Sequence, residues 1–183
     1  MSSGNRSRAE LVAGVSAILA GTCWLGWVFL TNVLPAAAIQ GSRTAKLMQL
    51  LMTGWNLLLI PAALQLQARF GLEKKGLLGM ICGIVSLSFW GYGGATNSIT
   101  PALEIAYLLL SGFWWTGIGI SLFGHNRALA FFTALLAGFA FFDACLSFLE
   151  PIPFYIYVLA APKLPLSIAW DFWVGIFLLN RTA

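Results

Sequence analysis

Residues 167–179 read SIAWDFWVGIFLL, an apolar run that carries a single carboxylate, Asp171. Hydrocarbon offers no hydrogen bonds, so such a run can lie in a membrane only as a helix whose backbone groups bond one another. An acid within it is costly and is expected to face the protein interior. The stretch therefore predicts a helical membrane protein and marks a candidate site.

The composition of the whole chain agrees with this interpretation. Of its 183 residues, 60% are hydrophobic and only 9% are charged, whereas soluble proteins average about 25% charged residues. The mean hydropathy is +0.86. Since each crossing takes about 20 apolar residues, the chain has room for about six helices and no separate soluble domain. We predict an all-α, polytopic transmembrane helix bundle that forms one domain over residues 1–183.

Six apolar runs, separated by Gly, Pro, Asn or charged residues, define the proposed spans. They cover residues 11–31, 47–67, 76–94, 101–123, 128–149 and 164–180. Between the last two, prolines bracket FYIYVLAA, a run too short to cross a bilayer. We expect an interfacial or re-entrant segment at about 150–163. A single Pro-kinked last helix starting near residue 154 is the alternative.

The distribution of basic residues predicts the orientation of the bundle. Seven of them fall on one side of six alternating spans and three on the other, and the more basic side of a membrane protein is normally cytoplasmic. Both termini are therefore predicted to be cytoplasmic, in a bacterial inner membrane. The two sets are Arg6, Arg8, Arg69, Lys74, Lys75, Arg127 and Arg181, against Arg43, Lys46 and Lys163.

Four acidic residues, Glu104, Asp143, Glu150 and Asp171, fall at mid-depth or in the outer half of the predicted spans. Other polar and aromatic residues recur at helical spacing at the same depth, and because lipid cannot satisfy them, these stripes should turn inward and meet. We expect a polar, aromatic-walled cavity there. The stripes are Gln49, Thr53 and Asn56; Trp24, Trp27 and Thr31; Glu104, Tyr107, Ser111 and Trp114; and Asp143, Ser147 and Glu150.

No Lys or Arg falls within a predicted span, so the sequence offers Asp143 and Asp171 no obvious cationic partner. Low-dielectric surroundings disfavour the charged form of such a carboxyl group, which predicts that both can donate a proton. Indole, phenol or amide groups of the stripes could hold them in place. The alternative is that both acids simply join helices by hydrogen bonds. Glu104 equally suits the first turn of a helix.

The tryptophans divide by predicted depth. Trp27 and Trp90 are assigned to an interfacial belt, where amphipathic rings gather. Trp114, Trp115, Trp170 and Trp173 lie too deep for a belt alone.

The residue types present in the sequence disfavour several kinds of chemistry. His125 is the only histidine, and the three cysteines form no C-x-x-C pair, so haem, zinc and thiol redox sites are not expected. We predict no metal, no cofactor and no nucleic-acid partner. The residues remain compatible with proton transfer by carboxylates. Aromatic faces beside these carboxylates can stabilise a carbocation.

A small helical body with intramembrane acids and many aromatic residues resembles, in inventory, the integral membrane terpene cyclases and sterol isomerases. The closing pattern W-D-x-W-x-G-x-x-L-L, from Trp170 to Leu179, is more similar to small bacterial multi-pass proteins of uncharacterised function, a resemblance that implies six helices without an activity.

Three hypotheses follow: a lipid-phase cyclase or isomerase; a non-enzymatic binding protein or proton-coupled carrier; and an accessory subunit. The partners expected are membrane lipid and a small apolar or isoprenoid ligand, with a homo-oligomer or a partner subunit as further options. The predicted catalytic residues are Asp171, Asp143 and Glu104. The predicted substrate-binding residues are Trp170, Trp173, Trp114, Tyr107, Trp24, Asn56 and Gln49.

Overall fold

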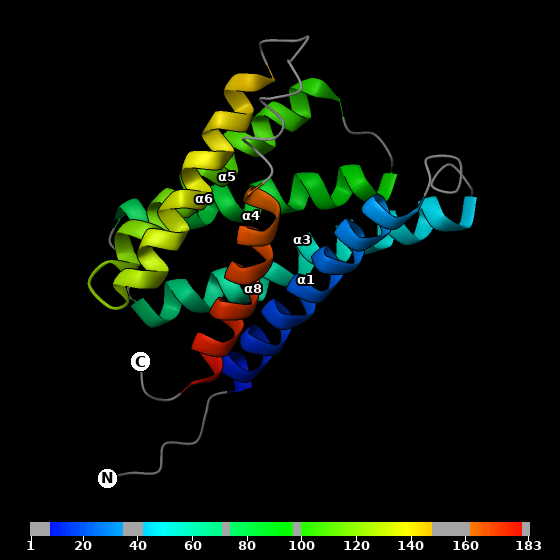
Figure 1. Ribbon diagram of the computed structural model, residues 1–183. Helices are drawn as coiled ribbons and strands as arrows, with labels where there is room; N and C mark the ends of the chain where they lie inside the picture. Colours follow the sequence, from blue (N-terminus) through cyan, green and yellow to red (C-terminus); the bar gives the residue numbers. More distant parts are fainter. Residues whose placement is uncertain (1–7, 35–41, 71–73, 97–99, 148–161, 181–183) are drawn as a thin grey trace.

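The computed structural model describes residues 8–34, 42–70, 74–96, 100–147 and 162–180, and this part of the chain forms six helices (Figure 1). The all-α class is confirmed, and each helix overlaps one of the six predicted apolar runs. The predicted interfacial segment, about 150–163, lies almost entirely outside the described residues. The helices are α1 (Arg8–Val33), α3 (Ser42–Phe70), α4 (Lys74–Thr96), α5 (Pro101–Leu122), α6 (Arg127–Leu146) and α8 (Lys163–Leu179).

Side-chain caps fix the N-terminal ends of two helices, α5 and α6. The Thr100 side chain accepts a hydrogen bond from the Leu103 backbone N–H at 3.3 Å, and a proline follows it at the first position of α5. The Asn126 side chain accepts one from the Leu129 N–H at 3.0 Å at the start of α6. Each cap satisfies a backbone donor that the first helical turn leaves free.

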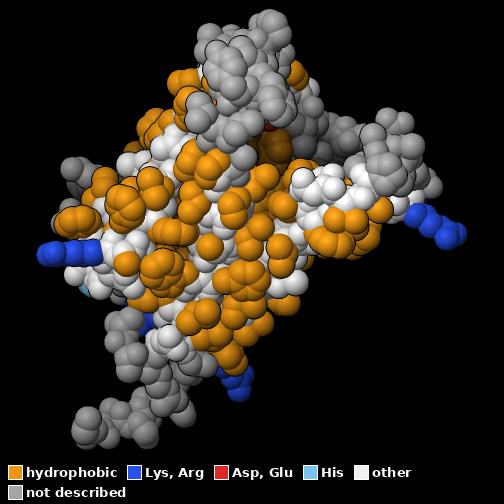
Figure 2. All heavy atoms as spheres, in the orientation of Figure 1, with side chains coloured by type: hydrophobic (Ala, Val, Ile, Leu, Met, Phe, Trp, Pro, Cys, Tyr) orange, Lys and Arg blue, Asp and Glu red, His pale blue; other side chains and the backbone are white. Residues whose placement is uncertain are grey.

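Four helices, α1, α3, α5 and α6, are long and apolar enough to cross a membrane. The apolar part of α4, Leu77–Gly93, is shorter, and α8 has 17 residues. Large hydrophobic side chains are exposed on every described helix, and Figure 2 shows them covering most of one face, with basic side chains at its margins. These features are those of an integral membrane protein; the number of crossings and the cytoplasmic location of the termini stay predictions.

The helices form a ring in which sequence neighbours pack side by side. Contacts join α1 to α3, α3 to α4, α4 to α5 and α5 to α6, and α8 returns to lie along α1 (Figure 1). The contact between α6 and α8, which closes the ring, is much smaller. Close approach of α1 and α8 requires glycine, because a Cβ on Gly175 would lie 2.9 Å from the Gly14 carbonyl oxygen.

Buried tryptophans fill the centre of the ring. Trp114 and Trp115 of α5 pack edge-on against Trp170 of α8, with ring centroids 5.9 and 6.5 Å apart. All three side chains are buried. Polar side chains also join neighbouring helices here, as Ser86 and Ser111 share a hydrogen bond of 2.7 Å between α4 and α5. The core is therefore built from aromatic faces and a few satisfied hydroxyl groups.

Candidate functional site

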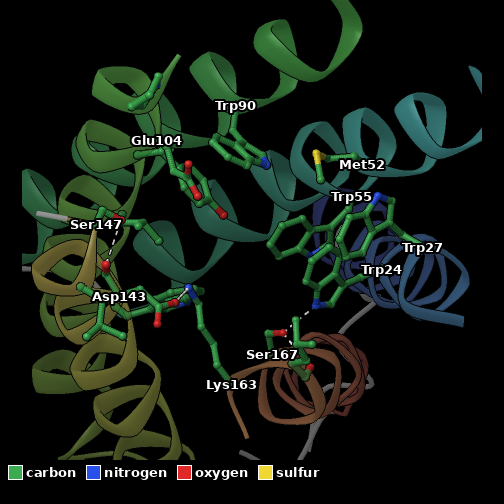
Figure 3. Close-up of a pocket in the computed structure, with 16 residues that line it drawn as sticks. Trp24, Trp27, Met52, Trp55, Trp90, Glu104, Asp143, Ser147, Lys163 and Ser167 are labelled. Carbon is green, nitrogen blue, oxygen red and sulfur yellow. Dashed lines mark hydrogen bonds and ion pairs between the residues drawn. The ribbon is translucent and has the colours of Figure 1, made fainter. Parts of the chain in front are cut away.

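A pocket of about 550 Å³ opens at the end of the bundle where α6 ends and α5 and α8 begin (Figure 3). All six described helices contribute side chains to its lining. Its lining consists of Trp24, Trp27, Met52, Trp55, Trp90, Pro101, Glu104, Tyr107, Leu108, Trp115, Asp143, Leu146, Ser147, Lys163, Leu164 and Ser167.

One wall of the pocket is a stack of three indole rings. The Trp24 ring lies between Trp27 of the same helix and Trp55 of α3, with centroids 4.8 and 4.3 Å apart and planes 14° and 12° from parallel. Figure 3 shows the three rings side by side on the wall opposite the charged residues. Stacked rings bury large areas at little cost in conformational entropy, so the wall is rigid and apolar.

Hydrogen bonds to α8 fix two rings of this stack. The Trp24 Nε1–H donates to the Ser167 hydroxyl at 2.7 Å, and the Trp55 Nε1–H donates to Oδ2 of Asp171 at 2.8 Å. Asp171 is 1% exposed. It lies close to Gly21 of α1, where an added Cβ would be only 3.1 Å from the Cβ of Asp171. The acid in the last helix therefore holds a ring of the pocket wall.

A second aromatic pair lies across the pocket from α8. Trp90 of α4 stacks on Tyr107 of α5 with ring centroids 4.4 Å apart. Trp115 also lines the pocket, and its buried Nε1–H has no acceptor within the described part of the chain.

The opposite wall carries charge. Lys163, the first residue of α8, forms an ion pair with Asp143 of α6, and their side chains are 19% and 21% exposed. Glu104 of α5 lies on the same side (Figure 3). The prediction that Asp143 lacks a cationic partner is wrong. Lys163 precedes the last apolar run, but its long side chain extends from the start of α8 to the neighbouring helix.

The structure brings some of the predicted site residues into this pocket and leaves others outside it. Those that line it are Trp24, Glu104, Tyr107 and Asp143. Those outside its lining are Gln49, Asn56, Trp114, Trp170, Asp171 and Trp173. The two aspartates are thus not neighbours in one cavity.

The residues outside the lining have structural contacts. The Trp170 Nε1–H donates to the Thr133 hydroxyl at 2.8 Å, joining α8 to α6. The Asn56 amide donates to the Met52 carbonyl oxygen at 2.8 Å within α3. Trp173 is half-buried and packs against Phe132, with centroids 5.6 Å apart.

Several pocket residues were not predicted from the sequence. Trp55 and Lys163 were absent from the candidate set, and Trp27 and Trp90 were assigned to an interfacial belt although they line the pocket. One signal for Trp55 existed: a buried indole N–H needs an acceptor, and the last apolar run holds a lone carboxylate. Nothing in the sequence paired the two, since they are 116 positions apart.

Comparison with protein-family models, with curated proteins and with solved structures finds no match to this chain. The functional argument therefore depends on the site alone. Rigid aromatic faces opposite an ion pair and a carboxylate suit a molecule that has both an apolar and a polar part.

Proposed function

We propose that this integral membrane protein binds a small amphipathic molecule in the pocket between its six helices. The observation that carries the proposal is that an aromatic wall faces a charged wall across the pocket. Stacked indoles form the first wall, and Asp143, Lys163 and Glu104 form the second. Ligand sites typically measure about 300–1,000 Å³ and combine aromatic lining with a few placed polar groups. The volume of about 550 Å³ lies within that range.

The cost of the charged wall supports a ligand-binding role over a purely structural one. Charges within a membrane protein are expensive, and those that occur tend to face cavities or pathways. The Asp143–Lys163 pair spans the seam between α6 and α8, the neighbouring helices of the ring with the smallest contact. A bundle that needed only stability could have closed this seam with apolar side chains, which often stabilise as well as a buried ion pair does.

A second candidate is the lipid-phase cyclase or isomerase acting on an isoprenoid or lipid. It is favoured by two carboxylates, Glu104 and Asp143, that line the same aromatic cavity. In this case Glu104 and Asp143 would exchange protons with the substrate, while Asp171 would be a positioning residue acting through Trp55. Loss of product from a panel of acyclic isoprenoids and their epoxides in Glu104→Gln, with binding retained, would identify the enzyme.

The binding proposal is tested by native mass spectrometry of the whole protein with lipid extraction. We expect a small molecule to co-purify with the wild type and to be lost in Leu164→Trp, which places an indole in the pocket. The matched control is Ile176→Trp, a change of similar size on the same helix at a side chain that is 51% exposed.

The control variant should retain the molecule, and size-exclusion profiles should show that both variants fold. Retention in Leu164→Trp at the wild-type level would contradict the proposal. So would a wild-type protein that carries nothing and takes up no neutral or charged amphipathic probe.

A further inference from the structure

The charges that line the pocket do not cancel. There are two carboxylates, Glu104 and Asp143, and one ammonium group, Lys163. The lysine is already paired with Asp143. Glu104 is exposed and forms no ion pair or side-chain hydrogen bond with any residue in the described ranges. Among the described residues, the pocket therefore presents one uncompensated negative charge, from its α5 wall.

Aromatic faces lie next to that charge. Glu104 and Tyr107 are three positions apart on α5, so their side chains occupy neighbouring positions on one helix face. The Tyr107 ring stacks on Trp90, and the three indoles of Trp24, Trp27 and Trp55 line the same cavity. Figure 3 shows Trp90 between Glu104 and these indoles. The face of an aromatic ring is electronegative, and tryptophan attracts a cation most strongly. Carboxylate and rings thus favour the same kind of ligand group.

We infer that the ligand of this pocket carries an ammonium group, with its positive charge between Glu104 and the aromatic faces and its apolar body along the indole stack. This inference rests on the proposed function and adds the charge of the ligand to it. An anionic head would be repelled by Glu104 and would find Lys163 already paired. A neutral headgroup would form no ion pair with the Glu104 carboxylate.

The ammonium group could belong to a free amine or to a lipid headgroup. A first experiment uses three water-soluble probes of similar size on the whole protein in non-ionic detergent: benzyltrimethylammonium, benzyl alcohol and benzenesulfonate. Binding is measured by calorimetry and by quenching of tryptophan fluorescence. We expect the cation to bind about tenfold more tightly than the other two probes. A cation–π contact and a carboxylate together should contribute about this difference in affinity.

The variant Glu104→Gln should lower the affinity for the cation by roughly threefold, because the aromatic faces remain, and it should leave binding of benzyl alcohol unchanged. The matched control is Glu10→Gln, which removes a carboxylate from the first turn of α1, outside the pocket lining. Because Glu104 is exposed, its amide variant should fold normally.

A second experiment distinguishes the source of the ammonium group. Native mass spectrometry compares retention of phosphatidylcholine with that of phosphatidylglycerol of the same acyl chains. Preferential retention of phosphatidylcholine, lost in Glu104→Gln, supports a headgroup; equal retention alongside binding of benzyltrimethylammonium supports a free amine. Preferential retention of phosphatidylglycerol contradicts the inference.

Two outcomes separate this inference from the proposed function. If benzyl alcohol or benzenesulfonate binds as tightly as the cation, or if Glu104→Gln leaves the cation affinity unchanged, the ammonium inference fails while the pocket remains a binding site. If none of the probes binds and no lipid is retained, the proposed function fails with it.

Discussion

At the level of single side chains, the pocket depends on indole nitrogens that find acceptors on α8. Trp24 donates to Ser167 and Trp55 donates to Asp171, so the orientation of two stacked rings is set by the last helix. In a low-dielectric interior, a buried donor left without its acceptor costs more than the bond contributes when it is made. The contact that Asp171 makes is therefore with the aromatic wall, and we predict that it stabilises this wall.

Replacement of Asp171 tests this role. Asp171→Asn keeps a carbonyl oxygen for the Trp55 N–H, and we expect stability within about 0.5 kcal/mol of the wild type. Asp171→Leu leaves that donor buried and unpaired, so we expect a loss of about 1–2 kcal/mol. Thermal unfolding in detergent, followed by tryptophan fluorescence, measures both. A leucine variant as stable as the asparagine variant would show that the hydrogen bond does not hold the wall.

The ion pair across the seam is tested by a double-mutant cycle. Asp143→Asn and Lys163→Gln should each destabilise the protein, and the double variant should lose less than the sum, with a coupling of about 0.5–1 kcal/mol because both side chains are partly exposed. The charge swap Asp143→Lys with Lys163→Asp should recover part of the loss. Strictly additive single effects would mean that the two groups do not interact.

The sequence predicted some of the side chains that line the pocket but not their partners. Glu104, Tyr107 and Trp24 were expected at a pocket and line one. The Asp143–Lys163 pair and the Trp55–Asp171 bond could not be predicted, because each joins helices whose order around the ring is not encoded in hydrophobic spacing. Periodicity places a residue on a face of its own helix, whereas a pair requires knowing which helix lies opposite.

At the level of whole helices, the six apolar runs translate closely into observed helices, because a membrane helix needs about 20 apolar residues and ends where charged, Gly or Pro residues begin. The fourth run, predicted at 101–123, is the helix Pro101–Leu122. How closely two helices approach depends instead on where glycines meet. A Cβ on Gly83 would lie 2.4 Å from the Trp114 ring, so α4 can pack on the tryptophan core only with glycine there.

Glycine substitutions test the α1–α8 contact. In Gly175→Ala the new methyl group would lie 2.9 Å from the Gly14 carbonyl oxygen and 2.6 Å from Ile18 Cγ1, and we expect a loss of about 1–3 kcal/mol. Gly138→Ala on α6 is the matched control, since nothing lies within 4 Å of its added Cβ. Alanine favours a helix over glycine, so the control should be neutral or slightly more stable. Equal thermal stability of the two variants would rule out tight packing at this crossing.

At the level of the whole molecule, the orientation predicted by the basic residues can be measured with reporter fusions in a bacterial host. A fluorescent protein fused after Ala183 should be active and alkaline phosphatase at the same site inactive, since the C-terminus is predicted to be cytoplasmic. Phosphatase fused after residue 40 should be active. Active phosphatase at the C-terminus would contradict the predicted cytoplasmic location of this end of the chain.

The ring of helices closes weakly between α6 and α8, and the pocket opens at the end of that seam. Along this seam α6 and α8 are joined by the Asp143–Lys163 ion pair, by the hydrogen bond from Trp170 to Thr133 and by the packing of Trp173 on Phe132. At that end of the ring, the stacked indoles of Trp24, Trp27 and Trp55 form one wall of the pocket.

The central claim, that this pocket binds a small amphipathic molecule, is tested most directly by photo-crosslinking with a neutral long-chain alcohol that carries a diazirine, followed by peptide mapping. We expect saturable label within residues 143–147 and 162–167, which Leu164→Trp removes and Ile176→Trp leaves in place. Label confined to outward-facing side chains such as Phe131, unsaturable and indifferent to Leu164→Trp, would contradict the claim.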